Sequence, residues 1–194
     1  MPSINALNRP KGQFSVRPAV QSDMSQILAI YTHYVLVSTS TFEEVPPSRK
    51  QLVARWRDSR NRGLPYLVAE EGKQIVGFAY ANSYRERSAY RYTVEDSLYV
   101  DHEMTGRGIG NALLTALIEQ CQAMNLRQLI AIIGDTNNTS SIALHKKHGF
   151  TIVGTLKDTG YKFNQWIDTV VMQRSLTDKL SPSSTRGQPM AFKR

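Results

Sequence analysis

A glycine-rich loop between a predicted strand and a predicted helix is the feature that most constrains the fold of this chain. The loop follows a run of strand-forming residues that ends at Val100, and apolar residues then recur at helical spacing from Ile109. Gly106, Gly108 and Gly110 allow the backbone to approach a ligand closely. Their amides, with the first free N–H groups of the helix, form a nest for an anion such as a pyrophosphate. The alternative is a glycine turn that only caps the helix.

Two common nucleotide-binding motifs do not fit this loop. A P-loop requires a Gly-Lys-Ser/Thr ending, and the loop has none. The Rossmann fingerprint requires G-x-G-x-x-G near the first strand-to-helix turn of the fold, whereas this loop reads G-x-G-x-G and lies in the middle of the chain. The sequence therefore indicates a phosphate-binding loop of another kind.

Helical and strand periodicities alternate along the chain, which predicts an α/β fold. We expect a mixed central sheet of about seven strands flanked by about four helices. Ser22 and Ser48 are the predicted N-caps of the first two helices. The predicted strands span residues 14–18, 66–69, 74–81, 91–100, 129–133, 151–161 and 167–174, and the predicted helices span residues 22–35, 48–63, 109–124 and 139–148.

The two ends of the chain differ in composition from its body. Residues 1–13 and 177–194 lack periodicity and are predicted to be flexible, with residues 14–176 forming one domain. The net charge is +8, of which the ends contribute +2 and +3. The remaining +3 argues against a strongly basic nucleic-acid surface, so we expect no specific nucleic-acid partner.

The chain shows no sign of secretion or membrane insertion. It has one cysteine, Cys121, no apolar signal peptide in residues 1–13, and no apolar run of the roughly 20 residues that a spanning helix needs. We therefore expect a cytoplasmic protein without a membrane partner. The four histidines show no metal-binding spacing, so no metal site is predicted.

Several motifs carry a resemblance to a known family. A strand followed by Arg/Gln-x-x-Gly-x-Gly/Ala at the start of a helix resembles the acetyl-CoA loop of the GNAT N-acetyltransferases, although Thr105 stands where many members have Gln or Arg. Five further motifs look like the phosphinothricin acetyltransferase subfamily, in the same order and between residues 14 and 176. They read TFE from Thr41, PYLVAE from Pro65, AYRYTVEDSLYV from Ala89, SIALHxxxGF from Ser141 and GxKFxxWxD from Gly160.

The resemblance implies a GNAT fold, acetyl-CoA as co-substrate and a homodimer. The strand end before the loop offers backbone groups that can pair with the pantetheine amides. Asn137 and Ser140 are side-chain candidates, but the same stretch also reads as a helix-capping turn. The candidate cofactor-binding residues are Leu98, Tyr99, Val100, Gly106, Arg107, Gly108, Ile109, Gly110, Asn111, Asn137 and Ser140.

Glu95 is the candidate general base. Acetyl transfer to an amine requires that the ammonium group lose its proton, and a carboxylate suits this task. In a regular strand Glu95 and Asp96 point to opposite faces, so one of the two can face a given pocket. The resemblance selects Glu95. The alternative is an ordinary carboxylate paired with Arg91 or Arg85.

His145 is the candidate acid for the departing thiolate. At helical spacing it shares one face with Ser141, Leu144 and His148. The phosphinothricin-type enzymes resemble this chain in using histidine at this position, and a neutral-pH donor fits imidazole. The spacing is equally consistent with hydrogen-bonded core histidines.

The acceptor site is predicted from two segments: the cations and aromatic residues just before the strand that carries Glu95, and the segment after the first helix. The candidate acceptor residues are Phe42, Glu43, Arg85, Arg87 and Tyr90, and Lys162 and Trp166 lie in the final hairpin. The resemblance implies acetylation of the α-amino group of a small amino acid such as phosphinothricin, methionine sulfoximine or methionine sulfone. The alternatives are a protein N-terminus, lysine or polyamine as acceptor, or a CoA-binding protein without catalysis.

Overall fold

The computed structural model describes residues 14–177 and contains one mixed sheet in the order β1-β2-β3-β4-β5-β7-β6. Neighbouring strands are antiparallel except for the parallel pair β4 and β5. The predicted α/β fold and its order of elements are confirmed. The strands are β1 (Ser15–Pro18), β2 (Tyr66–Glu71), β3 (Gln74–Ser83), β4 (Thr93–Val100), β5 (Gln128–Gly134), β6 (Thr151–Lys162) and β7 (Gln165–Ser175).

Four α-helices and three short 3₁₀ turns connect these strands in the described part of the chain. They are η1 (Gln21–Asp23), α1 (Met24–Val37), α2 (Arg49–Asn61), η2 (Ser88–Tyr90), η3 (His102–Met104), α3 (Ile109–Ala123) and α4 (Thr139–Lys147). Within residues 14–177, none of these helices is long and apolar enough to cross a membrane. The predicted tails, apart from Thr177, lie outside the described residues.

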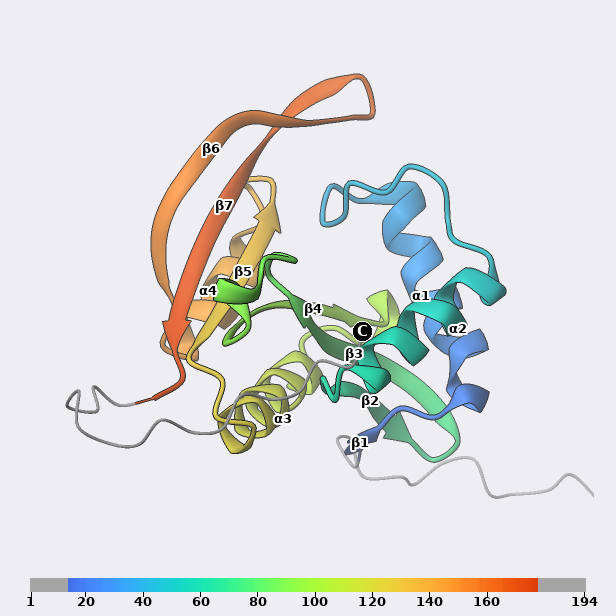
Figure 1. The fold of residues 1–194 in the computed structure, drawn as a ribbon. Coiled ribbons are helices and arrows are strands. Elements are labelled where there is room, and N and C mark those ends of the chain that lie inside the picture. Colours follow the sequence, from blue (N-terminus) through green and yellow to red (C-terminus); the bar gives the residue numbers. More distant parts are fainter. Residues whose placement is uncertain (1–13, 178–194) are drawn as a thin grey trace, which may run out of the picture.

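The helices cover the two faces of the sheet (Figure 1). On one face, α1 and α2 pack on β2 and β3 around Met24, Trp56 and Phe78. On the other face, α3 packs through Leu113 and Leu117, which are fully buried. Strands β2 and β3 thus lie in a buried central layer between these helices.

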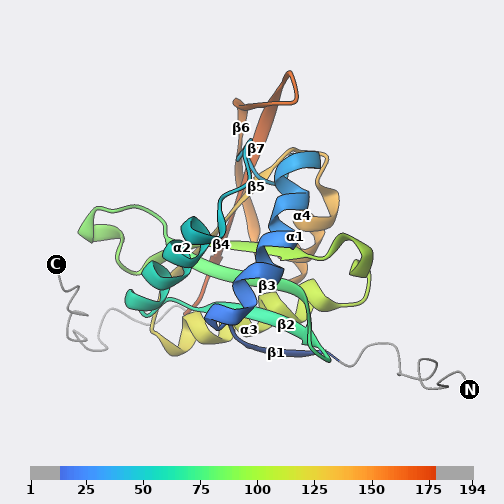
Figure 2. The ribbon, with the colours of Figure 1, turned by 90° about the vertical axis from the view of Figure 1, so that its right-hand side faces the viewer.

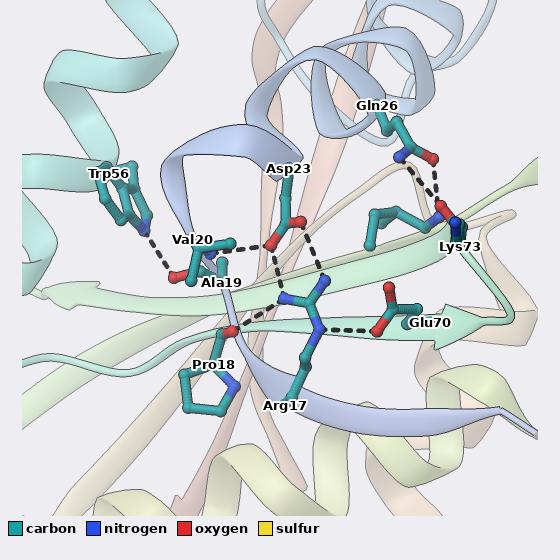
Figure 3. A network of polar contacts seen from close by, with 10 residues as sticks. Arg17, Pro18, Ala19, Val20, Asp23, Gln26, Trp56, Glu70 and Lys73 are labelled. Carbon is teal, nitrogen blue, oxygen red and sulfur yellow. Dashed lines mark hydrogen bonds and ion pairs between the residues drawn. The ribbon is translucent and has the colours of Figure 1, made fainter.

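A polar network joins the first strand to the first helix (Figure 3). Arg17 of β1 donates to both oxygens of Asp23, at 2.7 and 3.0 Å, and to Glu70 of β2 at 2.8 Å. Asp23 also accepts the Val20 N–H at 2.8 Å. These contacts fix the η1 turn, so α1 begins at Met24 and the predicted N-cap Ser22 is wrong, because Ser22 lies inside η1.

The second helix begins as predicted. The Ser48 side chain accepts the Gln51 N–H, and the Gln51 side chain accepts the Ser48 N–H at 2.8 Å, which is a capping box. The strand predicted from Arg91 begins at Thr93, because η2 and a turn occupy the preceding residues.

Candidate active site

Strands β4 and β5 separate halfway along the sheet, and this separation creates the first cavity. Their parallel pairing runs from Thr93 with Gln128 to Asp96 with Ala131 and then stops. Beyond that point a cavity of about 450 Å³ lies between the strand ends, the glycine loop and the start of α4. An opening of this kind in the middle of a sheet exposes strand edges to a ligand.

The exposed edge of β4 belongs to its even-numbered residues. The Asp101 N–H donates to the Val76 carbonyl of β3 at 2.9 Å, and the Tyr84 N–H donates to the Thr93 carbonyl at 3.3 Å. Because alternate residues of an antiparallel strand direct both backbone groups to the same neighbour, the groups of Leu98 and Val100 face the cavity. Tyr34 of α1 donates to the Val100 carbonyl at 2.6 Å.

The glycine loop closes the cavity at the N-terminus of α3. Gly106 and Gly108 have φ angles of +75° and +82°, in the left-handed region that favours glycine, and Gly108 is the N-cap. Arg107 points elsewhere: its guanidinium donates to the Glu71 carboxylate at 2.7 and 3.2 Å, and Arg107 does not line the cavity. The loop therefore offers an anion its amides and the helix N-terminus, with the arginine charge already paired.

Most of the candidate cofactor-binding residues line this cavity. Those that do are Leu98, Tyr99, Val100, Gly106, Gly108, Ile109, Gly110, Asn111 and Ser140. Asn137 is exposed and lies outside the lining, while its neighbour Asn138 lines the cavity and caps α4 by accepting the Ser141 N–H at 3.2 Å. Sequence reasoning treated Asn138 as part of a capping turn, and that capping position was the available signal.

Glu95 lies on the α1 and α2 side of β4. It is half-buried, and its partner across the ladder is Asn82 of β3. Among the described residues no ion pair involves Glu95, so its carboxylate is not neutralised by Arg91 or Arg85. Burial raises the pKa of Glu95, the charge of Asp96 adds to this effect, and Arg85 opposes it. A carboxylate of this kind can take a proton from an amine.

His145 and Asp96 form a buried pair on the opposite face. His145 Nε2 lies 3.0 Å from Asp96 Oδ2, and Nδ1 lies 2.7 Å from the Ser141 carbonyl oxygen. Burial lowers the pKa of His145, but the hydrogen bonds and the Asp96 charge outweigh it, so the pKa lies above the ordinary value. Both residues line the first cavity. Sequence reasoning did not assign Asp96 to the site, because alternation showed only that it faces away from Glu95.

A second cavity of about 460 Å³ lies on the Glu95 side of the sheet. Its walls include the aromatic side chains of Tyr31, Tyr66, Phe78 and Tyr80, together with Asn82. Its charged lining residues include Arg55 and Glu43, which form an ion pair at 2.6 Å. The cavity thus combines aromatic walls with charges of both signs.

The candidate acceptor residues occupy two segments around this cavity. Glu43 lines it, and Phe42 lies beside Glu43 in the connection between α1 and α2. Arg85, Arg87 and Tyr90 are exposed in the connection between β3 and β4 and do not line the cavity. Within residues 14–177, no group of three or more His, Cys, Asp or Glu side chains is arranged to hold a metal ion.

Comparisons with known proteins identify the family of this chain. Residues 16–171 match the acetyltransferase (GNAT) domain family. The chain is 49% identical over 162 residues to a phosphinothricin N-acetyltransferase of Alcaligenes faecalis, covering 84% of this chain and 82% of the relative. It is 38% identical over 164 residues to an L-methionine sulfoximine/L-methionine sulfone acetyltransferase of Pseudomonas aeruginosa, covering 84% and 94%.

A solved structure shares the fold. The phosphinothricin acetyltransferase of Sinorhizobium meliloti in complex with acetyl-CoA superposes with a TM-score of 0.85, at 42% identity, covering 90% of this chain and 94% of that chain. The family match and the relatives lead to one conclusion. The chain belongs to the GNAT family and is an acetyl-CoA-dependent N-acetyltransferase of the phosphinothricin and methionine sulfoximine type.

Proposed function

We propose that this enzyme transfers the acetyl group of acetyl-CoA to the α-amino group of a small amino acid such as phosphinothricin, methionine sulfoximine or methionine sulfone. The relatives named above support this class of acceptor. The observation that carries the proposal is the position of Glu95. This half-buried carboxylate has no ion-pair partner within residues 14–177 and lies on β4, the strand that borders the first cavity. Across the ladder it faces Asn82, which lines the second cavity.

The first cavity fits acetyl-CoA, which supplies an activated thioester. We propose that the amides of Gly106 and Gly108 and the start of α3 hold the pyrophosphate. The backbone groups of Leu98 and the Val100 N–H, which face the cavity, pair with the pantetheine arm as a further strand would. A backbone N–H on this edge also stabilises the thioester oxygen as it gains negative charge.

In the proposed reaction the amine attacks the thioester directly within a ternary complex. Glu95 takes the ammonium proton, the new C–N bond forms, and the C–S bond breaks to release a thiolate. No enzyme nucleophile is needed. This agrees with Cys121, the one cysteine of the chain, because the thiol is buried and burial, with the Asp96 charge, raises its pKa to about 12.

His145 is the proposed proton donor to the thiolate. It lines the first cavity, and its pKa is raised above the ordinary value of histidine by the hydrogen bonds and the charge of Asp96. Both of its ring nitrogens already have partners, so one of these contacts must open before the proton is transferred. Water in the cavity is the alternative donor.

The proposed acceptor site lies between residues 42–43 and β4. Aromatic walls suit the apolar part of a small amino acid, and the pair of Arg55 with Glu43 offers a charge of each sign to a zwitterion. Arg85, Arg87 and Tyr90 remain proposed contacts from the exposed loop before β4.

A thiol-release assay with acetyl-CoA tests this function. The acceptor panel contains phosphinothricin, methionine sulfoximine, methionine sulfone, a polyamine, a lysine peptide and a peptide with a free N-terminal alanine. We expect release with the three amino acids and background rates with the others. Release with the polyamine or a peptide alone would refute the proposed acceptor class, and no release with any acceptor would refute catalysis.

We also propose a homodimer that forms through the C-terminal hairpin. Large apolar side chains are exposed on β6, on β7 and on the turn between them, although natural edge strands are usually protected by charged side chains or proline, or are very short. These residues are Ile152, Val153, Leu156, Tyr161, Phe163 and Trp166, with exposed fractions between 47% and 65%.

A further inference from the structure

Lys162, at the end of β6, is a buried cation that the reaction described above does not use. Its exposed fraction is 2%, which makes it one of the largest fully buried side chains in the described residues. Its ammonium group donates to the Ser38 carbonyl at 2.7 Å and to the Thr41 carbonyl at 2.8 Å. No ion pair involves Lys162 within residues 14–177. A buried ammonium group is costly unless its hydrogen bonds are satisfied, so these two carbonyl contacts are specific features of the fold.

The segment that receives these hydrogen bonds is the connection between α1 and α2, and we call residues 38–43 the strap. In Figure 1 this connection lies on the same side of the molecule as the β6–β7 hairpin. Two more hydrogen bonds tie the strap to the end of β5 and the start of α4. Thr39 donates to Asp135 at 3.1 Å, and the Asn138 side chain donates to Ser40 at 3.3 Å.

Phe42 fixes the far end of the strap against two glycines. A Cβ atom on Gly160 of β6 would come within 2.5 Å of the Phe42 ring, and one on Gly134 would come within 3.2 Å of it. The ring therefore occupies space that any other residue at these positions would fill. Gly160 and Lys162 are two residues apart on one strand and present the same face. The Gly-x-Lys pattern thus places the glycine that leaves room for the Phe42 ring next to the lysine that donates to the strap carbonyls.

We infer that Lys162 is a positioning residue that holds the strap, and with it Phe42 and Glu43, in the conformation that binds the acceptor. This inference rests on the proposed acceptor site at these two residues. Lys162 lines neither cavity, so it acts through the strap and not by touching substrate. Without the ammonium group, the carbonyls of Ser38 and Thr41 lose their donor and the strap opens toward solvent.

The test compares Lys162→Met, Lys162→Gln and Lys157→Met in the full-length chain. Lys157 is the matched control, because it lies on the same strand but its side chain is 74% exposed in a surface ion pair with Asp168. For Lys162→Met we expect the KM for methionine sulfoximine to rise about tenfold or more, and the KM for acetyl-CoA to change less than about twofold. Lys162→Gln, which can still donate to one carbonyl, should lie between the wild type and the Met variant.

Hydrogen exchange measured by mass spectrometry gives a readout that needs no acceptor. In the Lys162 variants we expect faster exchange in residues 38–43, with unchanged exchange in β2, β3 and α3. Lys157→Met should match the wild type in both measurements. If Lys162→Met does not fold, the Gln variant carries the test.

Each outcome has a defined meaning. Wild-type exchange in the strap and a wild-type acceptor KM in the Met or Gln variant would overturn the inference. Equal rises in the KM for methionine sulfoximine and the KM for acetyl-CoA, with faster exchange throughout the sheet, would also overturn the inference. That pattern would mean that Lys162 stabilises the whole fold. Faster exchange confined to the strap, together with a wild-type enzyme that acetylates no amino acid, would refute the proposed function and leave the strap contact standing.

Discussion

Glu95 and Asp96 are neighbours in sequence, but the strand turns their carboxylates to opposite faces of the sheet, where they meet different partners. Glu95 has no ion-pair partner among the described residues and stays available for an amine proton. Asp96 is buried against His145, and its second oxygen, Oδ1, has no hydrogen-bond partner among the described residues. In the proposed reaction the first carboxylate takes the ammonium proton, while the second holds the His145 imidazole.

Replacing Glu95 with Gln should lower kcat by about 10²-fold or more, because the amide cannot accept the ammonium proton. Burial raises the pKa of Glu95. As the pH decreases, wild-type activity should therefore begin to fall at a higher pH than it would with an exposed glutamate as the base. The variant should lack this acidic limb in a kcat/KM profile against pH. Glu103→Gln, at an exposed carboxylate in η3, is the control and should keep both turnover and profile. Wild-type turnover in Glu95→Gln would remove Glu95 from this role.

Replacing Asp96 with Asn should destabilise the protein by about 3 kcal/mol, because it leaves a buried imidazole without its carboxylate. The pKa of His145 is higher in the folded protein than in the unfolded chain. The stability that protonated His145 contributes is therefore complete below the pKa in the unfolded chain and is lost as the pH rises through the pKa in the folded protein. In urea unfolding, Asp96→Asn should lower the free energy of unfolding more at about pH 6 than at about pH 9. A loss that does not depend on pH would contradict a charged pair.

The matched control for that experiment is Asp58→Asn. Asp58 pairs with Arg62 four residues along α2, and both side chains are largely exposed. Asp58→Asn should lower the free energy of unfolding by less than about 0.5 kcal/mol, and this change should depend little on pH.

The sequence predicted these residues unevenly. Glu95 and His145 followed from motifs that resemble the family, and strand alternation placed Glu95 and Asp96 on opposite faces, as the structure has them. The pairing of Asp96 with His145 joins residues 49 apart on different elements, and no local pattern encodes such a contact. The pairing of Arg107 with Glu71 was missed for the same reason.

At the scale of elements, the site depends on a helix that starts where two strands separate. The glycine loop and α3 could be predicted, because glycine spacing and helical periodicity are local signals. The end of the β4–β5 pairing at Asp96 and Ala131 could not, because it depends on how strands distant in sequence twist within the sheet. The hydrogen bonds from Lys162 to the strap join residues 121 and 124 apart in the sequence, so no local pattern could predict them either.

Replacing Gly108 with Ala should weaken acetyl-CoA binding, because a left-handed φ at the N-cap of α3 aligns the loop amides. We expect a stability loss of about 1 kcal/mol and at least a tenfold rise in the CoA dissociation constant measured by calorimetry. Gly63 is the matched control, since it has a φ of +73° and, like Gly108, open space where a Cβ would lie. Gly63→Ala should lose similar stability and bind CoA normally. Equal CoA affinity in both variants would refute the role of the loop.

At the scale of the whole molecule, the C-terminal hairpin stands apart from the helical layers (Figure 2). β6 lies at one edge of the sheet and pairs with β7 alone. Its 12 residues carry several exposed apolar side chains, including Ile152 and Leu156. A long apolar edge of this kind tends to associate with another chain unless something covers it. A second copy of the same chain would cover both hairpins at once in a symmetric dimer.

Replacing Leu156, which is 52% exposed, with Glu should shift the protein from dimer to monomer, because a charge would be buried against the partner hairpin. Multi-angle light scattering after size-exclusion chromatography measures this directly, and we expect the mass to fall to that of one 21.9 kDa chain. Val20→Glu is the control, because Val20 is 46% exposed next to β1, at the opposite edge of the sheet. It should leave the dimer intact. A monomeric wild type would refute the proposed dimer. A Leu156→Glu variant that remains a dimer would show that the interface does not include Leu156.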